Sequence, residues 1–156
     1  MTTDYKPTTI NYNHKLTSIL NTFYTACAIF PSEFWCVGNG YEKLDCYKAS
    51  VRLTELVLPL CYELRTRYDR VYITQMKRAS LSITSNLVEG YGRISKKQQA
   101  QFLRYSIGSC NELTEQLKIL RHDPEFMDLQ SIADAILSEL EGVTKLLWGY
   151  YNYLLK

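Results

Sequence analysis

Residues 75–97 read QMKRASLSITSNLVEGYGRISKK, and this stretch decides the fold. Apolar side chains in this stretch, and in the residues just before it, recur at the spacing of one helical face. A helix is therefore predicted from about Val71 to Glu89. The predicted apolar face consists of Ile73, Met76, Ile83 and Leu87. Gly90 and Gly92 are expected to end this helix, because glycine readily takes the left-handed conformation past a helix C-terminus.

Three more helices are predicted around this one. The first runs from about Leu44 to Arg67, and Pro59 inside it is expected to kink it. The third begins at Ser95, which forms a capping-box pattern with the glutamine three residues later. Its apolar side chains form a heptad-like stripe of Leu103, Ile107, Cys110, Leu113, Leu117 and Leu120. The fourth begins at Asp123-Pro124, as N-cap and first-turn proline, and runs to the end of the sequence. No alternating run competes, so the predicted fold class is all-α, an antiparallel up-down-up-down four-helix bundle.

The chain has 156 residues, of which 46% are hydrophobic and 22% charged, a length that suits one domain with an appendage. Residues 1–40 carry few charges and no sustained period, so they are interpreted as a poorly ordered extension of a bundle domain at 41–156. A signal peptide is the alternative for the uncharged run Leu16–Ser32, although that run is polar for this role and too polar for a membrane span. Composition therefore favours a soluble protein.

Charge is distributed unevenly along the chain. Residues 65–104 hold nine basic and two acidic side chains, a net charge of +7, whereas residues 41–64 carry −1 and residues 105–156 carry −4. The overall net charge of +2 conceals this asymmetry. A basic segment between acidic ones indicates a partner of opposite charge more often than it indicates a fold.

The turn between the second and third helices breaks local electrostatic rules. Lys96 and Lys97 fall where the helix dipole is positive, and Glu89 falls where it is negative. In the functional interpretation, basic side chains join exposed helix N–H groups to hold a phosphate backbone. In the structural one, Glu89 pairs with Arg93 or Arg104. The predicted nucleic-acid-binding residues are Arg78, Arg93, Lys96, Lys97 and Arg104.

One polar stripe follows the second helix at spacings of three and four residues. Its members are Gln75, Arg78, Ser82, Asn86 and Glu89. The stripe is interpreted as a buried network that fixes helix register, with an interface to a partner as the alternative. Gly108, inside the third helix, is expected to allow a close helix approach.

The fourth helix carries a second apolar stripe beyond what one bundle core needs. This stripe consists of Leu137, Trp148, Tyr151 and Leu155. It predicts a subunit interface in a homo-oligomer, and the alternative is a monomer with half-exposed aromatic side chains.

Residues typical of enzymes and metal sites are scarce. The sequence has no Glu-x-x-His and no Cys-x-x-Cys, so no catalytic residue, metal or cofactor is predicted. Cys61 and Cys110 are expected as small core residues, and an odd cysteine count fits a reducing cytoplasm. His122 is expected to act as a dipole partner at the end of the third helix.

Two patterns and a terminal helix together resemble a known family. The first pattern is filled by Gln75, Arg78, Ala79, Ser82, Ile83, Asn86, Glu89 and Gly90. The second is filled by Phe102, Leu103, Gly108, Ser109, Glu112, Leu113, Gln116 and Leu117. With residues 145–154, they make residues 42–155 resemble the bacterial four-helix-bundle proteins encoded in intervening sequences of large-subunit ribosomal RNA genes. Lys77 and Val88 are mild departures.

The resemblance implies a five-fold ring of bundles and no known enzymatic activity. A related protein, the accessory variability determinant of diversity-generating retroelements, partners a reverse transcriptase and binds nucleic acid. The chain is therefore expected to be a cytoplasmic, ring-shaped homo-oligomer that binds structured RNA or an RNA-handling partner through its basic turn. The alternative is a protein-interaction scaffold, for example for a reverse transcriptase, without direct nucleic-acid contact. No membrane partner is expected.

Overall fold

The computed structural model describes residues 40–156, which belong to one compact unit of the chain. Its elements are η2 (Gly40–Lys43), α2 (Asp45–Leu64), α3 (Arg70–Tyr91), α4 (Lys96–Arg121), η3 (Pro124–Leu129) and α5 (Gln130–Leu155). The described part is all-α, with four long helices and no strand. None of its helices is long and apolar enough to cross a membrane. The predicted extension and the alternative signal peptide lie outside the described residues, apart from Gly40.

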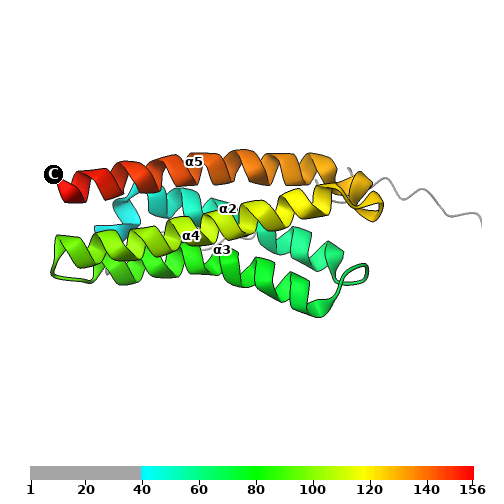
Figure 1. Cartoon of the computed structure of the whole chain (residues 1–156), viewed down its shortest axis with the longest axis horizontal. Helices are drawn as coiled ribbons and strands as arrows, with labels where there is room; N and C mark the ends of the chain where they lie inside the picture. The colour runs from blue at the N-terminus through cyan, green and yellow to red at the C-terminus, as the bar shows by residue number, and fades with distance from the viewer. Residues whose placement is uncertain (1–39) are drawn as a thin grey trace, which may run out of the picture. The chain divides into compact units, whose positions relative to one another are not determined.

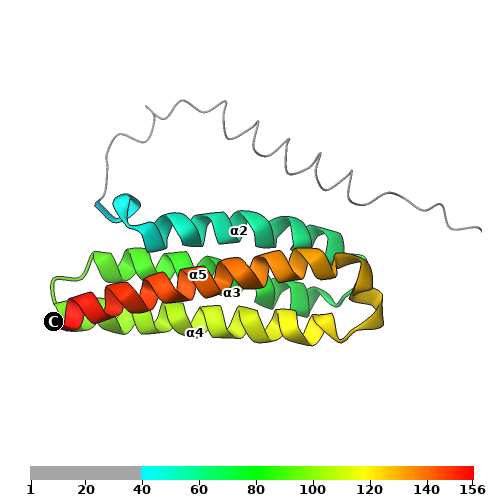
Figure 2. The ribbon, with the colours of Figure 1, turned by 90° about the horizontal axis from the view of Figure 1, so that it is seen from above.

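The four long helices pack side by side as a bundle. Helices α2 and α4 each pack against both α3 and α5 (Figure 1). Figure 2 shows η2, the α3–α4 connection and the end of α5 at one end of the bundle. The α2–α3 connection and η3 lie at the other end. Short connections therefore bring residues from distant parts of the sequence together at each end.

The core forms where the sequence pattern predicts it. The predicted apolar face of α3 is buried, with exposed fractions of 6% or less. The stripe predicted for α4 is buried as well: Leu103, Ile107, Cys110, Leu113, Leu117 and Leu120. Phe126 of η3 is completely buried, a core residue that the helical period did not single out.

A ladder of four hydroxyl groups crosses from α2 to α3, and we call it the hydroxyl ladder. Ser80 Oγ donates to Thr54 Oγ1 at 3.0 Å, and Thr84 Oγ1 donates to Ser50 Oγ at 3.1 Å. Ser50 and Thr54 also donate to carbonyl groups of their own helix. Because Ser50 and Ser80 are fully buried, these bonds satisfy groups that water cannot reach.

Helix starts differ in how they are capped. The Asp69 carboxylate accepts from Val71 N at 2.6 Å and caps α3. Asp123 accepts from Glu125 N at 2.9 Å, so the predicted cap is confirmed, although it begins the 3₁₀ segment η3 before α5. Ser95 occupies the N-cap position of α4 but its side chain makes no capping bond, so the predicted capping box is wrong. Helix α2 continues through Pro59 to Leu64.

Neither Gly90 nor Gly108 has the role predicted for it from the sequence. Gly90 lies inside α3, and no described glycine has a positive φ, so the predicted left-handed helix end is wrong. A Cβ on Gly90 would lie 2.7 Å from Phe102 Cβ, so it is here that α3 and α4 approach closely. A Cβ on Gly108 would meet nothing within 4 Å, so the close approach predicted there does not occur within the described chain.

Candidate nucleic-acid interface

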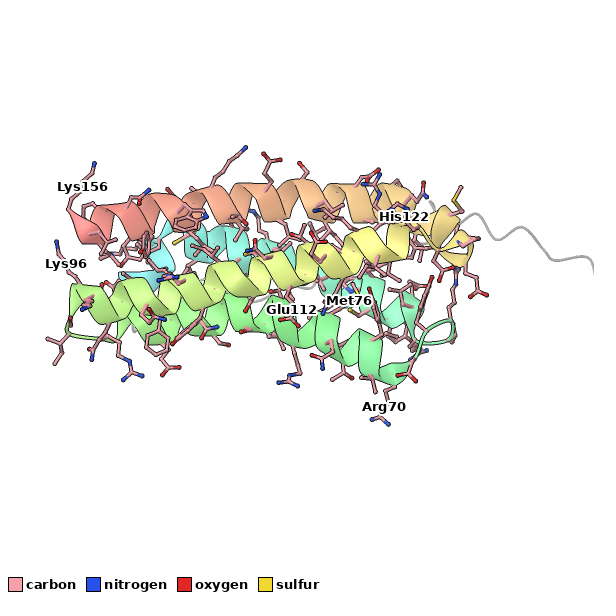
Figure 3. The ribbon with its side chains drawn as sticks, viewed as in Figure 1. Arg70, Met76, Lys96, Glu112, His122 and Lys156 are labelled. Atoms are coloured by element: carbon pink, nitrogen blue, oxygen red, sulfur yellow. The ribbon has the colours of Figure 1, made fainter. Side chains whose placement is uncertain are left out.

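The candidate site lies at the end of the bundle where the α3–α4 connection meets the last turn of α5. We call this region the basic end, meaning residues 40–48, 89–97 and 150–156. Figure 3 shows Lys96 and Lys156 together here, whereas Arg70 and His122 lie at the opposite end. Its basic side chains are Lys43, Lys48, Arg93, Lys96, Lys97 and Lys156, and its acidic ones are Glu42, Asp45 and Glu89.

The α3–α4 connection is a short turn held mainly by backbone bonds. Arg93 N donates to Gly90 O at 3.0 Å, and Gln99 Nε2 donates to Arg93 O at 2.7 Å. Ile94, at the tip of the turn, has an exposed fraction of 102%. The side chains on either side of the turn therefore face solvent from a fixed backbone.

The basic side chains of the turn are used in different ways. Arg93 forms an ion pair with Glu89, as the structural interpretation expects, and its guanidinium lies 4.8 Å from the Phe102 ring centroid. Lys96 and Lys97 are exposed and form no ion pair with any described acidic side chain. The dipole of α4 is positive where these two lysines lie, so they add to a positive potential that no described side chain neutralises.

The other two predicted basic residues lie farther along the helices. Arg104 is eight residues into α4 from Lys96, roughly 12 Å of helix, and Arg78 is twelve residues from Gly90, roughly 18 Å. Both are exposed, and neither has an ion-pair partner among the described residues. The structure therefore places Lys96, Lys97 and Arg93 together and leaves Arg104 and Arg78 on the sides of the bundle.

Exposed tyrosines share the basic end with the lysines, and they are not among the site residues predicted from the sequence. Lys96 Nζ lies 5.8 Å from the centroid of the Tyr153 ring, which is 66% exposed. Tyr91 is 38% exposed and meets the Tyr41 ring edge-on at 6.0 Å. The run Tyr150-Tyr151-Asn152-Tyr153 was the available signal, but locating it beside the turn requires knowing that α5 ends there.

The predicted polar stripe is only partly joined. Asn86 Nδ2 donates to Ser82 O and Oγ at 2.8 and 2.9 Å, and Ser109 Oγ of α4 donates to Ser82 Oγ at 2.9 Å. The Ser109–Ser82 bond connects α3 to α4 in the way a register-fixing network would, whereas the two Asn86 bonds lie within α3. Glu89 turns to Arg93, and Gln75 and Arg78 make no side-chain hydrogen bond within residues 40–156.

The predicted subunit-interface stripe on α5 is divided between core and surface. Leu137 and Tyr151 are half-buried against the chain's own core. Trp148 and Leu155 remain 44% and 56% exposed. The Trp148 and Tyr151 rings meet edge-on with centroids 5.3 Å apart.

The described cysteines are inert by placement. Cys46, Cys61 and Cys110 are buried, and desolvation raises the pKa of each thiol to about 11. They stay protonated at neutral pH, and the thiolate is the reactive form. The prediction that Cys61 and Cys110 are core residues is confirmed. Among residues 40–156 no three potential metal ligands gather at one place.

The opposite end, which we call the capped end, consists of residues 63–72 and 115–134. Its acidic side chains are Glu63, Asp69, Glu115, Asp123, Glu125, Asp128 and Asp134, and its cations are Arg65, Arg67, Arg70, Lys118 and Arg121. Arg67 holds both oxygens of Asp128 at 2.7 and 2.8 Å and donates to Glu125 O at 3.0 Å. Arg121 pairs with Asp134 at 3.3 Å. The expected contact of His122 with the dipole of α4 is not tested.

Comparison with known proteins supplies a family. The sequence model of a family described as "23S rRNA-intervening sequence protein" matches residues 42–149. A crystal structure from Bacteroides thetaiotaomicron VPI-5482, described as a protein with unknown function from the S23 ribosomal protein family, is similar in fold. Its TM-score is 0.60 and its sequence identity 19%, over 65% of this chain and 94% of that one. No curated protein matches this chain.

Proposed function

Because the chain belongs to the 23S rRNA-intervening sequence protein family, we propose that it is a non-enzymatic protein that binds structured RNA through its basic end. The observation that carries the proposal is the pair Lys96 and Lys97 in the first turn of α4, without an acidic partner among the described residues. Lysines at this place destabilise the helix by about 0.3–1 kcal/mol each. A phosphate backbone would compensate that loss, because its charge is favourable at a helix N-terminus.

We also propose that the helices run antiparallel, up-down-up-down, and that bundles assemble into a ring-shaped homo-oligomer, a pentamer as the resemblance implies. Connections at alternating ends support the antiparallel course, and the exposed Trp148 and Leu155 support self-association. A ring would present one basic end per subunit, so weak contacts with one RNA would combine through avidity.

A protein-interaction scaffold, for example an accessory protein of a reverse transcriptase, is the second candidate. It is favoured by the same exposed apolar side chains of α5, which suit a protein partner as well as a second copy. It differs from the first candidate in leaving Lys96 and Lys97 without a phosphate to bind.

The decisive experiment is fluorescence anisotropy of the full chain with a fluorescent hairpin RNA, titrated against salt. Binding should weaken linearly on a log–log scale, with a slope of about 0.7–0.9 per neutralised phosphate. The double variant Lys96→Glu, Lys97→Glu should lose binding and flatten the slope. Its matched control is Lys118→Glu, Lys145→Glu, which makes the same charge change at lysines paired with Glu115 and Glu141.

Each outcome assigns the function. Loss of binding in the basic-end variant alone supports the RNA-binding proposal. An equal loss of RNA binding in both double variants would mean that binding depends only on net charge. The basic end would then not be a specific site. No binding by the unaltered protein at low salt favours the scaffold.

A further inference from the structure

We propose that the basic end takes up unpaired nucleotides, whose bases stack on Tyr153 and Tyr91 while the lysines of the turn hold their phosphates. The inference rests on the proposed function and deepens it, because it names which part of an RNA is bound. It follows from the exposed aromatic rings that share the basic end with the cations, and the cations alone would not imply it.

The Tyr153 ring is a fixed and accessible platform. It is 66% exposed, although a ring of this size is stabilised by burial. Tyr150, half-buried against the core, lies nearly parallel to it, with centroids 6.4 Å apart and planes at 21°. The Tyr153 ring is therefore held next to a ring of the core and is available as a stacking surface.

Tyr91 offers a second ring near the other side of the turn. It is the last residue of α3, and its ring contacts Tyr41, which in turn contacts Tyr47 edge-on at 5.1 Å. The hollow beside it is lined by Gly40, Tyr41, Val88, Tyr91 and Gly92. These contacts fix the orientation of a ring that keeps 38% of its surface exposed.

One cation of the turn lies within one nucleotide of the Tyr153 ring. Lys96 Nζ is 5.8 Å from the Tyr153 centroid, and Lys97 follows it on the first turn of α4. In a nucleotide the base and the phosphate are separated by one sugar, so a base on Tyr153 would bring its phosphate near these ammonium groups. Stacking platforms beside cations are how proteins bind single strands without reading sequence.

Pairing decides whether such rings are useful. In a duplex the base faces are covered by their neighbours, so exposed tyrosines have nothing to stack on, while lysines attract duplex and single strand alike. Unpaired loops and ends offer free base faces together with phosphates. The arrangement therefore favours unpaired nucleotides, which either RNA or single-stranded DNA can supply.

The capped end provides a matched control. Tyr62, the residue just before the capped end, is 54% exposed and lies under a cation, because the Arg65 guanidinium is 3.7 Å from its ring centroid. Acidic side chains outnumber basic ones in the capped end, so a tyrosine–cation pair occurs there with less attraction for phosphate.

The test is anisotropy of the full chain, at one low salt concentration, with three probes of one sequence. They are a 20-nucleotide RNA without self-complementarity, the same strand as DNA, and that RNA annealed to its complement. Both single strands should bind more tightly than the duplex, and their relative affinity identifies the preferred source. Tyr153→Ala should weaken single-strand binding about 5- to 150-fold, the range of one lost base stack. Tyr153→Phe keeps the ring and should bind the single strand as tightly as the unaltered chain. Tyr62→Ala should leave this affinity unchanged.

The failures of the two proposals are distinguishable. Duplex binding as tight as single-strand binding, or equal losses for Tyr153→Ala and Tyr62→Ala, would overturn the unpaired-nucleotide inference while the RNA-binding proposal stands. Absence of binding to all three probes would overturn both and direct attention to a protein partner. Circular dichroism melting of each variant separates a lost contact from a lost fold.

Discussion

The two ends of the bundle differ in how polar and charged side chains are placed at the helix starts. At the capped end, Asp69 and Asp123 cap helix starts, and Arg67 bridges the α2–α3 connection to η3 through Asp128. At the basic end, the N-cap Ser95 makes no side-chain bond, and two lysines occupy the turn where a carboxylate would be favoured.

The difference indicates that the capped end contributes mainly to stability and that the basic end is arranged for the proposed binding. Local rules that agree with one another indicate a region selected for the folded state, and broken rules are expected at functional sites. The capped end follows most of these rules, with Arg70 in the first turn of α3 as an exception, whereas the basic end breaks several within nine residues. The predictions below test this contrast, beginning with the largest effect.

Gly90→Ala should destabilise the bundle by about 1–3 kcal/mol, because its Cβ would lie 2.7 Å from Phe102 Cβ, which cannot rotate away. Gly108→Ala is the control: with open space around it, it should stabilise by about 0.5–1 kcal/mol through helix propensity. Urea unfolding followed by circular dichroism measures both. Equal responses would mean that the close approach at the basic end carries no energetic weight.

Arg67→Ala should destabilise the protein by about 1–2 kcal/mol, the range for charge-assisted bonds reduced by partial exposure of the pair. Chemical unfolding at pH 7 gives the value. Arg65→Ala removes a neighbouring arginine whose side-chain hydrogen bond among residues 40–156 goes to Tyr62, and it should have a much smaller effect. Similar losses would show that bridging the α2–α3 connection to η3 adds nothing to the capped end.

The Arg67 effect should depend on pH. The hydrogen bond from Arg67 is the main cause that lowers the pKa of Asp128 from its ordinary value of 3.8. Because the folded pKa is the lower one, the pair stabilises above pH 3.8 and the contribution disappears as pH falls through the folded pKa. The stability difference between Arg67→Ala and the unaltered chain should therefore shrink below pH 3.8. A constant difference down to pH 2 would assign the effect to packing of the arginine.

Asp69→Ala should cost about 1 kcal/mol, the usual loss when a capping carboxylate is removed. Ser95→Ala should change the unfolding free energy by close to zero, because the Ser95 side chain makes no capping bond. Thermal or urea unfolding of the pair compares the ends directly. A loss at Ser95 as large as that at Asp69 would remove the distinction between them.

Lys97→Glu should stabilise the bundle slightly, by roughly 0.3–1 kcal/mol, because it replaces a cation with an anion at the positive end of α4. The same change should weaken RNA binding. Urea unfolding and fluorescence anisotropy on one sample would show whether stability rises while RNA affinity falls. A destabilised variant would indicate that Lys97 already has a stabilising role in the folded chain.

Most of the fold was predictable because burial follows helical period. The leucines of α4 and the apolar face of α3 were identified from spacing alone, since a side chain that recurs every three or four residues meets the same neighbours. Phe126 was missed because η3 is a short 3₁₀ segment without such a period.

The details that failed depend on partners distant in sequence. Gly90 and Gly108 look alike in the sequence, and only the position of Phe102 on the next helix separates them. The lysines of the site were found from charge, which is local. Tyr153 was not, because it lies more than fifty residues from Lys96 in sequence.

The hydroxyl ladder has a consequence for how this sequence can change over evolutionary time. Removing the Thr54 or Ser50 hydroxyl takes away the acceptor of the Ser80 or Thr84 hydroxyl, whereas replacing both members of a pair together is nearly neutral. A substitution at Thr54 should therefore be accompanied by one at Ser80, and a substitution at Ser50 by one at Thr84. Among homologues the two positions of each pair should covary. This covariation would reveal the register of α2 against α3 from sequences alone.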